Sequence, residues 1–178
     1  VISSTIDKYC YISCRNLPPF FDHDYRFVYS KIEEVKNINE IKHPSARAVL
    51  KETGIKNGLE IHHDGDLPAR SGLGSSSSFT VGFLNAVCAS KKIMLTKKEL
   101  AMESIRIEQK VIRESVGNQD QIAVSYGGLN RIKFYKDGGF NVKKIHMSDK
   151  KYIDLQNHLA LFFTGVSRTS STIAKHII

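Results

Sequence analysis

The sequence has few cysteines and no long hydrophobic run, and both shortages narrow the classes of protein it can belong to. Its 178 residues include three cysteines, at positions 10, 14 and 88. Their number is odd and their spacing is not that of a metal site, so we expect free thiols in a cytoplasmic protein. No apolar stretch is long enough to span a bilayer, no signal peptide is visible, and we expect no membrane partner. The chain begins at Val1 rather than at a methionine, so we expect sequence upstream of it.

A concentrated basic tract is also missing, although the formal net charge is +8. Basic proteins attract phosphate-rich partners, so nucleic-acid binding is one class to weigh. The lysines and arginines are instead spread along the whole chain and are not interleaved with aromatic residues. This dispersal favours a solvated surface without a nucleic-acid partner. A basic cleft would suit phosphorylated small molecules equally well.

One short stretch, residues 66–79, combines glycines and serines with the start of an apolar helical pattern. Gly72 and Gly74 flank one leucine, and four serines follow them. Glycine lets a ligand approach the backbone, and serine favours the start of a helix. Such a turn directs unpaired N–H groups and the positive end of the helix dipole at one point, which predicts a phosphate site. The buried face expected of the helix consists of Phe79, Phe83, Leu84, Val87 and Cys88.

Two alternatives for this stretch are weaker. A flexible Gly/Ser linker has a similar composition, but the stretch is short and is bounded by Leu67-Pro68 and by the helical pattern. A Walker phosphate loop requires Gly-Lys-Ser/Thr after its glycines, and that tripeptide is missing here.

Alternating strands and helices are predicted on either side of the serine run. Before it we expect strands at 1–14, up to Tyr29 and at 59–63, with a helix at 44–53 between them. The core contributors expected in the first strand are Ile6, Tyr9, Tyr11 and Ile12. Pro44 lies in the first turn of the helix and Gly54 just past its end, as is typical of helix boundaries.

After the serine run we expect a helix at 79–89, a helix that begins at the capping box 96–99, a helix that begins near 117–121, and strands at 129–135 and 140–145. The apolar face of the second of these helices consists of Leu100, Ile105, Val111 and Ile112. Residues 149–157 are interpreted as a polar connector, 159–164 as a buried strand and 170–178 as the start of a helix.

Two histidine-containing runs look like metal sites at first sight. Adjacent residues on a strand point to opposite faces, so neither Asp22-His23-Asp24 nor His62-His63 is expected to converge on one ion. We interpret the first run as an exposed turn. In the second we expect one exposed and one half-buried histidine.

Residues 68–77, Pro-Ala-Arg-Ser-Gly-Leu-Gly-Ser-Ser-Ser, resemble the second motif of the GHMP small-molecule kinases, and the chain most resembles their D-glycero-D-manno-heptose 7-phosphate kinases. Further support comes from residues 107–109, 117–121, 126–130 and 163–168. The resemblance covers roughly residues 1–175. It implies an α+β fold: a GHMP-kinase N-terminal, ATP-binding domain (ribosomal protein S5 domain 2-like) over 1–157, and the start of a truncated ferredoxin-like C-terminal domain over 158–178.

The same resemblance implies ATP- and Mg²⁺-dependent phosphorylation of a sugar phosphate, at the anomeric hydroxyl of D-glycero-D-manno-heptose 7-phosphate. The implied ATP-binding residues are Pro68, Arg70, Ser71, Gly72, Leu73, Gly74, Ser75, Ser76 and Ser77. Ser76 and Glu108 would hold the metal, and Asp120 would be the catalytic residue. Thr164, Gly165 and Arg168 would contact the sugar phosphate.

Each implied role has a plainer alternative. Glu108 would otherwise be a surface helix carboxylate, Asp120 would favour a helix start through the dipole alone, and Arg168 would be exposed on a connection. Other possible functions are another GHMP-fold sugar kinase, an ATP-using decarboxylase, or a non-catalytic nucleotide- or sugar-binding relative. The oligomeric state is left open, with a homodimer as one candidate. Because the first motif and most of the second domain are missing, we expect these 178 residues alone to be inactive.

Overall fold

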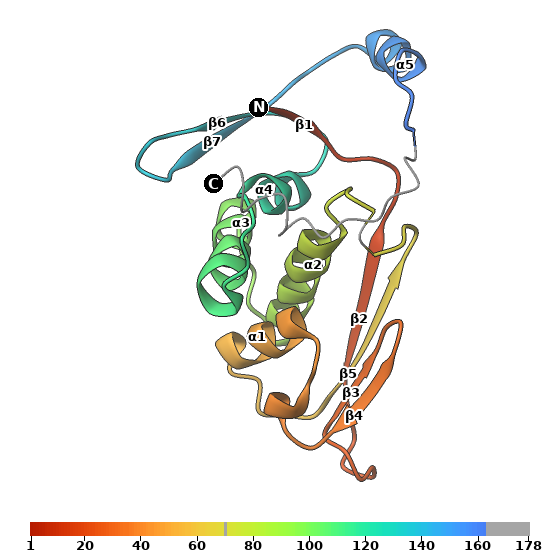
Figure 1. Cartoon of the computed structure of the whole chain (residues 1–178), viewed down its shortest axis with the longest axis vertical. Coiled ribbons are helices and arrows are strands. Elements are labelled where there is room, and N and C mark those ends of the chain that lie inside the picture. The colour runs from red at the N-terminus through yellow and green to blue at the C-terminus, as the bar shows by residue number, and fades with distance from the viewer. Residues whose placement is uncertain (70, 163–178) are drawn as a thin grey trace.

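A four-stranded sheet with helices on one face carries most of the core (Figure 1). The computed structural model describes residues 1–69 and 71–162. The first sheet has the order β2 (Cys10–Asn16), β5 (Leu59–Gly65), β3 (Tyr25–Val28), β4 (Ile32–Val35). The second sheet has the order β1 (Ile2–Ser4), β6 (Leu129–Phe134), β7 (Phe140–Lys144). The helices are η1 (Ile38–Glu40), α1 (Pro44–Thr53), α2 (Ser75–Ser90), α3 (Lys97–Arg106), η2 (Ile107–Ile112), α4 (Gln119–Tyr126) and α5 (Asp149–Asn157).

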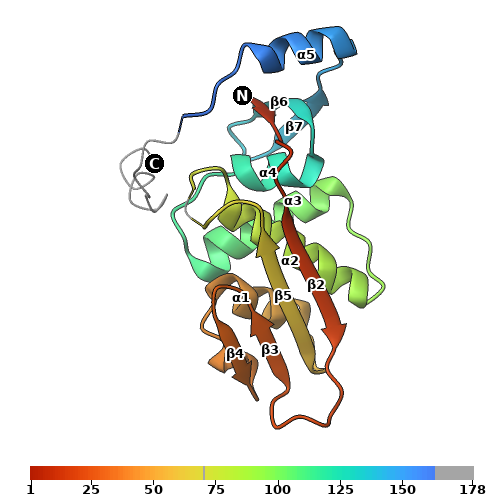
Figure 2. The same cartoon turned by 90° about the vertical axis from the view of Figure 1, so that its right-hand side faces the viewer.

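Helix α2 supplies the centre of the core, as its sequence pattern predicts. The five residues of its expected apolar face are all buried. Phe27 of β3 is fully buried against it, with ring centroids 5.8 Å from Phe79 and 6.5 Å from Phe83. In two nearly perpendicular views α1 and α2 lie on the same side of the sheet (Figures 1 and 2). The other face of this sheet therefore carries the polar members of each alternating strand.

That outer face holds a row of alternating charges across all four strands. Arg15 faces Glu60, Glu60 faces Arg26, and Arg26 faces Glu34 in the strand register. Glu60 is only 4% exposed and accepts hydrogen bonds from Arg15 Nε and Arg26 Nη1, both at 2.5 Å. His62 lies beside it, with 2.9 Å between Nε2 and Glu60 Oε1. Hydrogen bonds from His62, Arg26 and Arg15 lower the pKa of Glu60 to about 2.

Replacing Glu60 with Gln should change the acid limb of the stability curve. A carboxyl whose pKa is lowered by folding contributes stability that is present above its unfolded value and is lost as the pH falls through the folded value. The parent's free energy of unfolding should therefore decrease between about pH 4.5 and 2, and Glu60→Gln should lack that part of the decrease. Urea titrations at a series of pH values measure this, and superimposable acid limbs would contradict it.

Helix α1 begins at a histidine that is also part of the core. His43 is its N-cap, and its Nδ1 accepts the backbone N–H of Ala46 at 3.3 Å. The ring lies 4.6 Å from the Phe79 ring and 5.3 Å from the Phe27 ring, between centroids. Burial lowers the pKa of His43 to about 4, and the nearby His63 adds to the effect. The imidazole is therefore neutral at pH 7, with its proton on Nε2.

The depressed pKa of His43 predicts a second acid effect, at higher pH than that of Glu60. Between pH 6.5 and about 4 the unfolded chain binds a proton at this position that the folded chain does not, so stability falls as the pH falls through that range. The full loss of folding free energy across this range is about 3 kcal/mol, from the size of the pKa shift. His43→Asn keeps a capping side chain and should flatten the pH 6.5–4 portion of the curve. The Glu60→Gln variant is the control, since its effect lies at lower pH.

Three sequence predictions fail at the two ends of the chain. Residues 1–14 form two strands in different sheets, and Ile6, Tyr9 and Tyr11 are 49, 59 and 52% exposed. Ile6 and Tyr9 lie in the segment between the two strands, outside both cores, and Tyr11 lies on the outward face of β2. Residues 149–157 form the helix α5, which stands apart from the remaining elements (Figures 1 and 2). Residues 159–162 are exposed and form no strand, so the expected buried strand is wrong over its described part.

The middle of the chain matches expectation more closely. Helix α1 has the predicted bounds, with Gly54 in the left-handed conformation at its end, and the 129–135 and 140–145 strands pair as a hairpin. Asp22 and Asp24 are exposed in a bend, His62 faces outward and His63 packs inward against Phe79. All three cysteines are free thiols. Among the described residues, no helix is both long and apolar enough to cross a membrane.

Candidate functional site

The glycine-serine stretch forms a sharp entry into α2. Gly72 and Gly74 have φ values of +78° and +74°, a conformation that other residues rarely adopt, and Gly74 is the N-cap of the helix. The first helical hydrogen bond is donated by Ser78 to the Gly74 carbonyl at 2.9 Å. The N–H groups of residues 75–77 therefore have no acceptor within the helix and can bind an anion.

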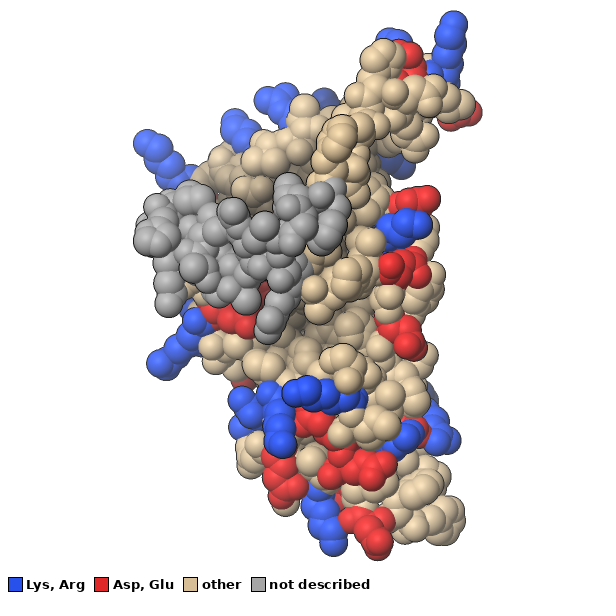
Figure 3. Space-filling view, turned by 45° about the vertical axis from the view of Figure 1, so that its right-hand side comes forward, with Lys and Arg blue, Asp and Glu red and all other residues tan. Residues whose placement is uncertain are grey.

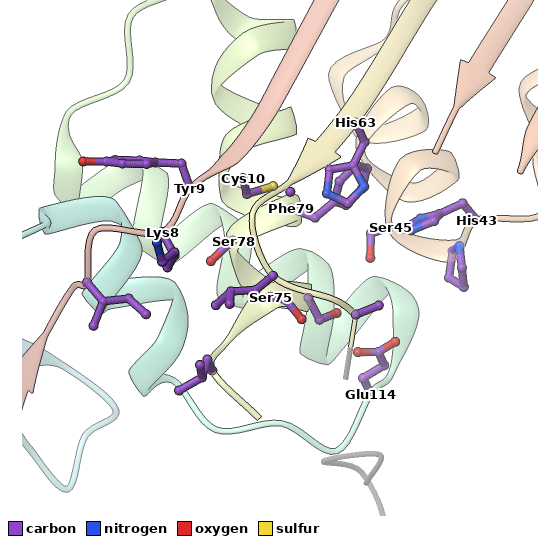
Figure 4. Close-up of a pocket in the computed structure, with 17 residues that line it drawn as sticks. Lys8, Tyr9, Cys10, His43, Ser45, His63, Ser75, Ser78, Phe79 and Glu114 are labelled. Carbon is purple, nitrogen blue, oxygen red and sulfur yellow. The ribbon is translucent and has the colours of Figure 1, made fainter. Parts of the chain in front are cut away.

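A cavity of about 340 Å³ opens beside this turn (Figure 4). Its walls come from the segment leading into β2, the first turn of α1, the end of β5, the following loop and the first turn of α2. Ser75, Ser76 and Ser78 line it, so the free end of α2 faces into the cavity. Its volume is in the range of small-molecule sites.

Charged groups are few in the described wall of this cavity. Lys8 is a cation at one side, and Glu114 is a carboxylate at another (Figure 4). Burial, followed by the charge of Glu108, raises the pKa of Glu114. Burial lowers the pKa of both His43 and His63, so the two imidazoles are neutral donors or acceptors near pH 7. Burial also raises the pKa of Cys10 to about 11, which leaves its thiol protonated and unreactive.

Glu108 is almost fully buried behind the first turn of α2, at 1% exposure. It belongs to η2, one turn of wider π-type helix that continues α3. Its Oε2 accepts hydrogen bonds from Ser77 Oγ, at 3.1 Å, and from the buried amide of Gln121. Its Oε1 has no partner among the described residues. Hydrogen bonds therefore fix the Glu108 carboxylate at one oxygen and leave the other oxygen for a ligand. The alternative interpretation of Glu108 as a surface helix carboxylate is wrong.

Asp120 lies in the first turn of α4 and reaches the predicted phosphate-binding turn. A Cβ placed on Gly74 would lie 3.4 Å from Asp120 Cγ, so the carboxylate packs directly against the N-cap of α2. Asp120 is itself exposed. The structure thus places the predicted catalytic residue beside the predicted phosphate site, although their positions are far apart in the sequence.

The loop between Glu108 and Asp120 is fixed by its own hydrogen bonds. Gln109 Nε2 donates to the Val116 carbonyl at 2.9 Å and to Asn118 Oδ1 at 2.6 Å. Arg113 ends η2 in the left-handed conformation, at φ 63°, which is unusual for a residue with a side chain. These contacts set the spacing between the two carboxylates.

The donors present are compatible with a magnesium ion. Mg²⁺ takes oxygen ligands and commonly only one or two from protein. Glu108 offers a buried oxygen without a partner, and the exposed Ser76 lies in the cavity wall. Within the described residues, Ser77 rather than Ser76 contacts Glu108. The predicted residues Arg70, Thr164, Gly165 and Arg168 lie outside the described part of the chain.

Several residues of the cavity wall and of the layer behind it were missed by sequence reasoning. Gln121 is fully buried beside Glu108, and its place directly after Asp120 was the available signal. Lys8, His43 and Glu114 come from segments whose distance from the serine run hides their proximity. Only the strand pairing and the packing of α1 on α2 bring them together.

Comparisons with known proteins identify the family and the fold. The family model for the GHMP kinases N terminal domain matches residues 39–128. The D-glycero-alpha-D-manno-heptose 7-phosphate kinase of Campylobacter jejuni is 30% identical over 118 residues, which are 66% of this chain and 35% of that protein. The chain thus spans about a third of that curated relative.

Solved structures share the fold. A D-glycero-D-manno-heptose 1-phosphate kinase from Bacteroides thetaiotaomicron superposes with a TM-score of 0.73 at 21% identity, over 86% of this chain and 53% of the other. Lactococcus lactis galactokinase, complexed with galactose, superposes with a TM-score of 0.60 at 15% identity, over 90% and 52%. The mixed α+β architecture and the matched family model together show that the chain belongs to the GHMP kinases, through their N-terminal domain.

Proposed function

We propose that this protein is an ATP-dependent kinase that phosphorylates a sugar phosphate. The single observation that carries the proposal is the contact of Asp120 with Gly74, beside the free N–H groups of residues 75–77. A phosphate bound at the end of α2 would lie next to a carboxylate that can receive a proton. Family membership and the Campylobacter relative support the kinase assignment.

The reaction would be an in-line phosphoryl transfer. The acceptor hydroxyl oxygen forms a bond to the γ-phosphorus as the bond to the β–γ bridging oxygen breaks and ADP leaves. Asp120 takes or aligns the hydroxyl proton, and the turn at residues 72–77 holds the phosphates. Ser76 and Glu108 would hold Mg²⁺, which neutralises charge on the phosphate oxygens.

The finer assignment of the acceptor is the anomeric hydroxyl of D-glycero-D-manno-heptose 7-phosphate. It rests on the printed activity of the Campylobacter relative. The motifs at residues 107–109 and 117–121 also support it. ADP release by the full-length gene product, measured across a panel of hexose and heptose phosphates, tests both the kinase function and the identity of the acceptor. If no sugar phosphate in the panel supports ADP release, the proposed function is wrong. If a different sugar phosphate is preferred, only the finer assignment of the acceptor is wrong.

Asp120→Asn should separate chemistry from binding. It keeps the size of the side chain but removes the proton acceptor, so turnover should fall about 10²-fold or more while ATP affinity stays near that of the parent. Turnover is measured by coupled ADP release on the full-length gene product, and ATP binding by calorimetry. Gln119→Asn, on the same turn of α4 and also exposed, is the control. A variant within a factor of two of the parent would remove Asp120 from the mechanism.

Ser76→Ala and Glu108→Gln should act through the metal. Each removes an oxygen ligand, so each should raise the Mg²⁺ concentration needed for half-maximal rate. Mn²⁺ binding, followed by electron paramagnetic resonance with a non-hydrolysable ATP analogue, should weaken in parallel. Ser78→Ala, which alters another cavity serine, is the matched control. The metal assignment fails where both variants keep the parent's metal dependence.

A further inference from the structure

The cavity beside α2 has charges of opposite sign at two separate places in its wall. Lys8 precedes β2, and Glu114 follows η2, and both line the same space. In Figure 4 the two side chains lie well apart, with Ser75 between them. On the outer face seen in Figure 3, by contrast, charges of both signs are interspersed. The cavity therefore offers a ligand a cationic end and an anionic end.

The Lys8 end suits the phosphates of a ligand. The Lys8 ammonium is a point charge that binds phosphate oxygens. Ser75 and Ser78 line the same space and bring the positive end of α2 to it. An anion placed there is attracted by both groups.

The Glu114 end suits an uncharged group that donates hydrogen bonds. Its backbone is fixed by bonds from Glu114 N–H to the Glu108 carbonyl at 2.9 Å and from Val116 N–H to the Glu114 carbonyl at 3.0 Å. In Figure 4 its carboxylate lies on the same side of the cavity as His43 and Ser45. His43 and His63, whose rings contact Phe79, line the same cavity together with it. A phosphate would be repelled there, whereas a nucleoside would be accepted.

We propose that Glu114 is a specificity-determining residue that accepts hydrogen bonds from the nucleoside, and that Glu114 and Lys8 together orient the nucleotide in the cavity. The phosphates lie toward Lys8 and the nucleoside toward Glu114. This inference rests on the proposed function, in that it requires the cavity to take a nucleotide. The donor to Glu114 is either an amino group of the base or a hydroxyl of the ribose.

The two ends can be tested separately with two half-ligands, adenosine and inorganic tripolyphosphate, by calorimetry in EDTA. Glu114→Gln should weaken adenosine binding about tenfold, as expected for a lost charged hydrogen bond. It should leave tripolyphosphate binding unchanged or make it tighter, because a like charge is removed. Lys8→Gln should do the reverse, weakening tripolyphosphate about tenfold and sparing adenosine. The matched controls are Asp154→Asn and Lys150→Gln, both on the distant helix α5.

Three analogues identify the donor. Inosine lacks the 6-amino group of adenosine, and 2′-deoxyadenosine and 3′-deoxyadenosine each lack one ribose hydroxyl. The analogue that lacks the donor should bind the parent more weakly than adenosine does, and Glu114→Gln should weaken it no further. Glu114→Asp is a second variant that keeps the charge but withdraws it by one methylene. It should weaken adenosine while leaving tripolyphosphate unchanged, and it replaces Glu114→Gln where that variant does not fold.

Unchanged adenosine binding in the Glu114 variants would overturn the inference, as would equal losses of both half-ligands in Glu114→Gln and Lys8→Gln. ATP binding by the parent distinguishes a failure of this inference from a failure of the proposed nucleotide function. A parent that binds ATP, with Glu114 variants that bind adenosine as the parent does, disproves only the role of Glu114. A parent that binds neither ATP nor either half-ligand disproves the nucleotide function and this inference together.

Discussion

The left-handed backbone at Gly74 is the constraint on which the candidate site depends. A residue with a Cβ would be strained at φ +74° and would also contact Asp120. With glycine there, the chain turns sharply into α2, the first N–H groups stay unpaired, and α4 can approach the turn. The close approach of the Asp120 carboxylate to the predicted phosphate site is therefore a consequence of one missing side chain. Substitution at this position would disturb both at once.

A second constraint is the buried carboxylate of Glu108. Burying a carboxyl group to 1% exposure is costly unless it is hydrogen-bonded. Ser77 and Gln121 supply those bonds from α2 and α4, and both donate to the same oxygen. The arrangement joins three helices and leaves the other oxygen without a partner in the described chain. An unpartnered buried oxygen carries a desolvation cost, so the proposed Mg²⁺ ligand would also affect the stability of the helical layer.

The sequence predicted the parts of the structure that local pattern determines. Helix α1 follows from Pro44 and Gly54, and the buried face of α2 follows from its 3.6-residue period. Long-range pairing was not predictable in this way. Tyr11 alternates correctly within a strand, but only the register with β5 decides that it faces outward. Likewise, 149–157 is polar enough for a connector, and its helix has no buried residue that a hydrophobic pattern could reveal.

The candidate site shows the same division between local and long-range information. The phosphate turn is contiguous and could be recognised from residues 72–77 alone, whereas the cavity beside it combines four separate segments. Transfer between two bound molecules requires positions fixed to within about 1 Å, which contiguous loops rarely provide. Here two hydrogen bonds between Tyr9 and Asp66 hold the segment before β2 against the loop after β5, and the packing of α1 on α2 fixes His43. These contacts place Lys8 and His43 at defined positions in the cavity wall, and the proposed direction of a bound nucleotide depends on them.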